Sequence, residues 1–260
     1  MLKSSRQLNF IILALALLLL FCFFILTIAA KSDLTTSFDF DTTVKIQDHM
    51  PERLKPYLIK FVELGSWQIM SVAVFISMLI HRKHFWKIGI LYLFIVVVEV
   101  FGKYQLQHPP PPEMFVLRFE HLNLPDNYVR NEASFPSGHA ARSAFLVSIW
   151  IPYIFTNLFS YIKRHTEKVI SEFKLRLPFG FVLTRENALS FEIVDFIRIT
   201  FFIGIFTILF SFTFLVGFTK VYIGEHWMSD VIGGWLLGSG LGILATNEII
   251  KLLNNKLKEI

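Results

Sequence analysis

The chain has 260 residues, of which 54% are hydrophobic, and it contains 29 phenylalanines. Water-soluble domains rarely carry so many apolar residues, so the composition indicates an integral membrane protein. The formal net charge is +5, but no basic module with interleaved aromatic residues is visible, and we expect no nucleic-acid partner. The single cysteine, Cys22, excludes an intrachain disulfide.

Six apolar segments are each close to the length that crosses a bilayer. They are residues 9–30, 61–80, 85–102, 139–160, 199–218 and 231–252. The first follows Lys3 and Arg6, as a signal peptide would, but it is too long for the apolar region of a signal peptide. The sequence therefore predicts an all-α, six-span transmembrane bundle that forms one integral membrane domain over residues 1–260.

Lysine and arginine predict the orientation of the spans, because they concentrate in cytoplasmic loops. Residues 81–87 carry three of them and residues 161–198 carry seven, so we expect both loops to be cytoplasmic. Six spans then place both termini in the cytoplasm of a protein in the cell membrane. Residues 31–60, 103–138 and 219–230 face the other side. Residues 31–60 mix five basic with five acidic residues, which fits either short helices at the membrane interface or a solvated linker.

The unusual polar residues gather in two of these outer segments, near the ends of spans. Ionisable groups at such positions are functional candidates. The candidates are Lys103 after the third span, Ser137, Gly138 and His139 before the fourth, and Lys220, His226 and Asp230 between the fifth and sixth.

Their chemistry suits phosphoryl transfer. Ser137 after a proline is typical of a helix start, whose free N–H groups bind anions, and Gly138 lets a ligand approach the backbone closely. His139 can donate a proton there. His226 and Asp230 are four residues apart, so on a helix the carboxylate would orient the imidazole.

These residues form three motifs that resemble those of the type 2 phosphatidic acid phosphatase (PAP2) superfamily of membrane lipid phosphatases. The pattern K-x6-R-P is found here as Lys103 with Pro110 and Pro111, and PSGH is intact at residues 136–139. The pattern S-R-x5-H-x3-D is found as Thr219, Lys220, His226 and Asp230. The resemblance covers about residues 61–252, after a first span and an interfacial segment in residues 1–60. Both arginines of the family pattern are absent.

The resemblance implies a metal-independent lipid phosphatase without a cofactor, whose site faces away from the cytoplasm. His226 would attack phosphorus and form a phosphohistidine, supported by Asp230, while His139 would protonate the leaving group. Phosphate would be held by Lys103, Ser137, Gly138 and Lys220. The partners would be the bilayer and a substrate such as a polyprenyl pyrophosphate, phosphatidic acid or phosphatidylglycerophosphate. The sequence gives no indication about protein partners, in either direction.

Arg142 lies three residues after His139 and is a candidate replacement for a lost arginine at the phosphate. The alternative is that Arg142 pairs with Glu99 or Glu132 and only joins helices. Glu99 lies four residues before Lys103, so those two side chains also suit a helical ion pair.

Three alternatives to this function remain open. The chain could transfer phosphate to a lipid or sugar acceptor, or it could bind an anionic lipid without turnover. A metal site could also be built from outer-face residues, although their spacing does not favour one. Those residues are His108, Glu113, His121, Asp126, His139 and His226. Finally, Gly234, Gly238 and Gly242 recur every four residues, which predicts a close helix-packing seam.

Overall fold

The computed structural model describes residues 5–117, 133–154 and 189–258, and the regular structure within these ranges is helical. The helices are α1 (Ser5–Lys31), α2 (Thr36–His49), α3 (Lys55–Val62), α4 (Trp67–Ile80), α5 (Phe85–Leu106), a helix over residues 138–154, α7 (Leu189–Tyr222) and α8 (Met228–Lys258). Short 3-10 turns lie at Glu52–Leu54, Glu63–Gly65, Arg82–His84 and Glu113–Phe115. The predicted all-α fold is confirmed.

Several of these helices are long and apolar enough to cross a membrane. Four qualify singly, at Phe10–Lys31, Arg82–Leu106, Ile203–Tyr222 and Met228–Thr246, and a bent pair makes a possible fifth. The helix that begins at residue 138 is described only as far as residue 154, so the predicted span over residues 139–160 lies partly outside the described residues. The protein is an integral membrane protein, and the count of six spans stays a prediction.

The predicted span over residues 61–80 is not one straight helix but part of a bent pair of helices, which together are apolar enough for a broken span. The chain bends by 48° between Glu52–Gly65 and Trp67–Ile80. Ser66 is extended, with φ −59° and ψ 153°. A side chain at Gly65 would meet the side chains of Val216 and His139, so the turn is pressed closely against two other helices. A straight helix through this point is replaced by a corner beside His139.

Two other segments differ from or refine the expectations. Residues 31–60 contain α2 and most of α3, which agrees with short helices and not with a solvated linker. The predicted cytoplasmic loop over residues 161–198 lies outside the described residues as far as residue 188. Its remaining residues are helical, because α7 already begins at Leu189.

The helices pack around α8. The predicted seam is confirmed, since a Cβ at Gly234 would meet the backbone oxygen of Ser137 and one at Gly242 would meet the Ser148 side chain. On another side of α8, Gly240 admits Leu20 of α1.

The buried core between the helices includes Phe145, Ile149, Leu237, Leu241 and Ile95. Many large apolar side chains of α1, α5 and α7 face outward, as expected where lipid covers a protein.

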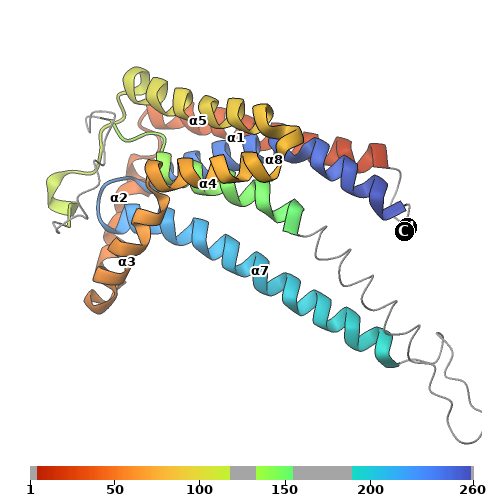
Figure 1. The fold of residues 1–260 in the computed structure, drawn as a ribbon. Coiled ribbons are helices and arrows are strands. Elements are labelled where there is room, and N and C mark those ends of the chain that lie inside the picture. Colours follow the sequence, from red (N-terminus) through yellow and green to blue (C-terminus); the bar gives the residue numbers. More distant parts are fainter. Residues whose placement is uncertain (1–4, 118–132, 155–188, 259–260) are drawn as a thin grey trace, which may run out of the picture.

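The two ends of the bundle differ in kind (Figure 1). The beginning of α1 and the end of α8 lie together at one end, whereas α2, α3 and the C-terminal end of α7 lie at the other. This arrangement places the two termini on the same side of the bundle. The opposite end collects the connections that carry the three sequence motifs.

Gly238 tests the importance of the seam, because a Cβ there would collide with the Ala141 carbonyl oxygen. Gly238→Ala should force α8 away from the helix over residues 138–154 and destabilise the fold by about 1–3 kcal/mol. Gly204→Ala in α7 is the matched control, since no described atom lies within 4 Å of its Cβ position. Thermal unfolding in detergent should show a lower midpoint for Gly238→Ala alone. Equal midpoints would contradict the seam.

Candidate active site

The three motifs meet at one end of the bundle. The end of α5, the start of the helix over residues 138–154, and the turn between α7 and α8 converge there (Figure 1). A backbone hydrogen bond joins two of them directly, because the Ser137 N–H donates to the Asp230 carbonyl oxygen over 3.0 Å. Residues almost a hundred positions apart are therefore in direct contact.

The PSGH stretch begins a helix, as predicted. Ser137 precedes its first residue, Gly138. The first N–H groups of a helix have no acceptor within the helix, so they are available to an anion. The Ser137 hydroxyl is buried without a hydrogen-bond partner among the described residues, as is the Thr219 hydroxyl at the end of α7. A Cβ at Gly138 would collide with the Glu99 carboxylate, so only glycine at this position leaves room for Glu99.

His226 and Asp230 are brought together, but not on one helical face. His226 lies in the turn before α8, and Asp230 lies in the first turn of α8. One carboxylate oxygen, Asp230 Oδ2, accepts the Trp227 N–H over 2.8 Å and lies 3.3 Å from His226 Nδ1. In a capping box, the side chain of the third helical residue accepts the N–H of the capping residue. Asp230 and Trp227 form this half of the motif at the start of α8. The contact that stabilises the start of α8 thus also orients the imidazole.

The other carboxylate oxygen of Asp230 faces a residue outside the predicted site. His108 Nδ1 lies 3.3 Å from Asp230 Oδ1, and His108 is buried. Burial alone would lower the pKa of His108, but the close contact with Asp230 and the charges of Asp230, Asp39 and Asp33 outweigh it and raise the pKa above its usual value. Sequence reasoning considered His108 only as a metal ligand. Within the described ranges, no cluster of three or more His, Cys, Asp or Glu side chains is arranged to hold a metal ion, and His121 and Asp126 lie outside those ranges.

Helix α2 holds this end of the bundle together. Asp39, which is 1% exposed, accepts the Ser229 N–H over 2.8 Å and the Ser229 hydroxyl over 2.7 Å. It thereby satisfies an N–H group at the start of α8 from a different helix. Burial raises the pKa of Asp39. Gln47, two turns further along α2, donates to the carbonyl oxygens of Phe115 and Tyr222 over 2.7 and 2.8 Å. No local sequence pattern pointed to either residue.

The predicted phosphate-binding cations have carboxylate partners. Lys103 Nζ lies 3.3 Å from Glu99 Oε1, which confirms the expected helical pair, and Arg142 Nη1 lies 2.6 Å from Glu99 Oε2. Arg142 therefore makes the structural pair that was its alternative role, and phosphate binding by Arg142 stays a prediction. Lys220 Nζ lies 2.5 Å from Glu225 Oε2.

His139 is partly exposed among these cations. It lies within Coulombic range of Lys220, Arg142, His226 and Lys103. Lys103, Arg142 and Lys220 are already paired with Glu99 or Glu225, so an anionic ligand would have to replace part of these carboxylate contacts.

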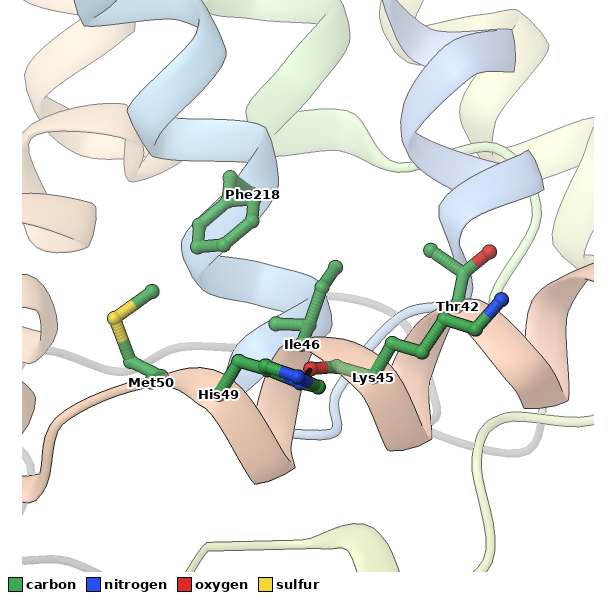
Figure 2. A pocket seen from close by; sticks show the side chains of 6 residues that line it. All are labelled: Thr42, Lys45, Ile46, His49, Met50 and Phe218. Atoms are coloured by element: carbon green, nitrogen blue, oxygen red, sulfur yellow. Dashed lines mark hydrogen bonds between the residues drawn. The ribbon is translucent and has the colours of Figure 1, made fainter.

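A separate pocket of about 380 Å³ lies between α2 and α7 (Figure 2). Phe218 of α7 faces Ile46 of α2 and Met50, which directly follows α2, across it, and Thr42, Lys45 and His49 complete its lining. None of the predicted site residues lines this pocket. Phe218, which lines the pocket, directly precedes Thr219 in the sequence and links the pocket to the candidate site.

Comparison with known proteins agrees with this geometry. Residues 84–251 match the sequence pattern of the PAP2 superfamily. The chain belongs to the PAP2 superfamily. The matched range contains all three motifs and ends within α8.

Two relatives of this PAP2 protein illustrate the likeness. The fold is similar to a transmembrane PAP2 type phosphatidylglycerolphosphate phosphatase from Bacillus subtilis, with a TM-score of 0.52 and 20% identity over 94% of this chain and 96% of that one. A segment of 31 residues is 55% identical to an undecaprenyl-diphosphatase from Sulfolobus acidocaldarius, which is 12% of this chain and 15% of that protein. The second match is local and covers a small part of either protein.

The buried pair of Glu99 and Arg142 can be tested by removing one charge. Glu99→Gln should remove the negative charge that Arg142 and Lys103 share and destabilise the protein by about 3–5 kcal/mol, because breaking a buried ion pair by removing one partner is costly. Glu113→Gln is the control, since Glu113 is exposed. Thermal unfolding in detergent should separate the two variants. A Glu99→Gln protein as stable as the control would show that the pair does not hold the helices.

Proposed function

We propose that this PAP2 protein is a metal-independent lipid phosphatase that acts through a phosphohistidine intermediate. The observation that carries the proposal is the contact between His226 Nδ1 and Asp230, 3.3 Å apart, beside an anion-binding helix start. The carboxylate keeps a proton on Nδ1, which leaves the Nε2 lone pair of His226 for attack.

The reaction has two displacements. First, His226 Nε2 bonds to phosphorus, the bond from phosphorus to the ester oxygen breaks, and that oxygen takes a proton from His139. Asp230 balances the positive charge that forms on the His226 ring. Second, His139 takes a proton from water, the water oxygen bonds to phosphorus, and the phosphorus–nitrogen bond breaks. Phosphate leaves and both histidines return to their first states.

Phosphate binding would use the helix start and the cations around it. The Gly138 N–H and the Ser137 hydroxyl would donate to phosphate oxygens, because both are placed there without a partner in the helix. Lys103 and Lys220 would exchange part of their contact with Glu99 and Glu225 for phosphate. Arg142, which is paired with Glu99, would add positive charge near the phosphate. It would not make the planar bidentate contact with phosphate that is typical of arginine.

The substrate class is a lipid phosphate or pyrophosphate monoester. The two relatives are named for a lipid phosphate and a polyprenyl diphosphate, and cations that can exchange their glutamate partners for phosphate suit the anionic headgroups of both. Phosphate transfer to a lipid or sugar acceptor is the second candidate, because a phosphohistidine can pass phosphate to any hydroxyl that reaches it. Binding without turnover fits less well, since His226 contacts Asp230 and His139 lies within Coulombic range of His226.

The mechanism predicts different losses for the two histidines. His226→Ala should abolish turnover and formation of the phosphoenzyme, whereas His139→Ala should lower kcat about 10²–10⁴-fold with little change in binding. Phosphate release from a panel of lipid phosphates, measured with EDTA present, checks both. Substantial turnover by a folded His226→Ala protein would exclude His226 as the nucleophile. Activity that is lost with EDTA and restored by zinc would exclude the metal-independent reaction.

We also propose that the site lies on the extracytoplasmic face of the cell membrane, with both termini in the cytoplasm. Met114 is 77% exposed at the site end, and Lys83 is exposed in the basic turn before α5. In a Cys22→Ser background, Met114→Cys should react with an impermeant thiol reagent added to intact cells, and Lys83→Cys should react only after lysis. The reverse pattern would invert the topology.

A further inference from the structure

We propose that His108 is a positioning residue, a second imidazole that holds Asp230 in the orientation that His226 needs. The inference rests on the proposed function, because it assigns a role in the same phosphoryl transfer. His108 belongs to the connection after α5, outside the three residues that the mechanism uses for proton and phosphoryl transfer.

The surroundings of His108 identify which ring nitrogen carries a proton. Ser134 Oγ lies 3.3 Å from His108 Nδ1, and it also lies 3.2 and 3.3 Å from the carbonyl oxygens of His108 and Pro109. Carbonyl oxygens only accept, so the single Ser134 hydroxyl proton is directed to them. The Ser134 oxygen can then accept from His108, and the acceptor-only Asp230 carboxylate 3.3 Å from Nδ1 also favours a proton on Nδ1.

That proton lies toward Ser134 Oγ and near Asp230, which is fully buried and whose Oδ1 has no aligned hydrogen bond among the described residues. An ionised carboxylate only accepts hydrogen bonds. Its Oδ2 faces the Trp227 N–H and His226 Nδ1, and its Oδ1 lies 3.3 Å from His108 Nδ1. The 3.3 Å contact with His108 Nδ1 is thus electrostatic, and without it the buried carboxylate would rotate or take up a proton. Either change would weaken its hold on His226.

The charge on His108 acts in the same direction. Its ring is influenced by three carboxylates, Asp230 of α8, Asp39 of α2 and Asp33 of the turn between α1 and α2. Burial lowers the pKa of His108, and these acids raise it above the usual value overall. A larger share of imidazolium at neutral pH places positive charge beside a buried carboxylate.

Two amide variants separate positioning from packing. The Asn amide nitrogen occupies nearly the place of Nδ1, whereas that of Gln occupies nearly the place of Nε2. His108→Asn should keep kcat within about threefold, and His108→Gln should lower kcat about ten- to hundredfold at nearly constant KM. Phosphoenzyme formation should slow in the Gln variant by the same factor.

A second measurement uses pH. A folded pKa above the unfolded value of 6.5 stabilises the protein below pH 6.5, and this gain is lost as pH rises through the folded pKa. The melting temperature of the unaltered protein should therefore exceed that of His108→Asn by more at pH 6 than at pH 9 (roughly spanning the titration of a histidine).

Each result supports or overturns the inference. Asn and Gln variants with equal kcat per folded molecule, whether both high or both low, would exclude a role through Nδ1. A stability difference that does not change with pH would exclude the charge effect. The proposed function itself is judged by His226→Ala, so turnover in that variant would reject the phosphohistidine mechanism, whereas equal Asn and Gln variants would reject only the role of His108.

Discussion

The site depends on one buried carboxylate, that of Asp230. A carboxylate taken out of water is costly unless donors surround it, and here those donors come from separate parts of the chain. The Trp227 N–H and His226 lie at one oxygen and His108 at the other, while the backbone carbonyl of the same residue accepts the Ser137 N–H. The desolvation cost of a single charge therefore helps to fix where α8 begins and how two histidines face that carboxylate. It also determines where the PSGH helix starts.

The same rule governs the cations. Arg142 is 2% exposed, and its pairing with Glu99, which Lys103 shares, satisfies the charge inside an apolar bundle. Under the proposed function, a phosphate must compete with Glu99 and Glu225 for these cations. Such competition favours headgroups with more than one negative charge. Glu99 and Glu225 also hold the positive groups in place before substrate binds, in a site that lacks the two family arginines.

The sequence predicted what depends on local spacing. PSGH predicted a helix start, the glycines four apart predicted a packing seam, and Glu99 with Lys103 predicted an ion pair, because each pattern acts within a few residues. The bend at Gly65 depends on Val216 and His139, so no local pattern could reveal it. The contact between Asp39 and Ser229 joins positions 190 residues apart. His108 was visible as a histidine, but its partner Asp230 follows only from the folded arrangement.

Helix α2 has a consequence for how the protein can be divided. The PAP2 match covers residues 84–251, yet Asp39 and Gln47 lie before it and satisfy backbone groups at Ser229, Phe115 and Tyr222. The limits of sequence similarity are therefore not the limits of the cooperative unit. A chimera that transplants only the matched region onto another membrane anchor would expose the N–H groups at the start of α8. Exchange between relatives should keep residues 36–49 with the motifs they hold, as one inseparable module.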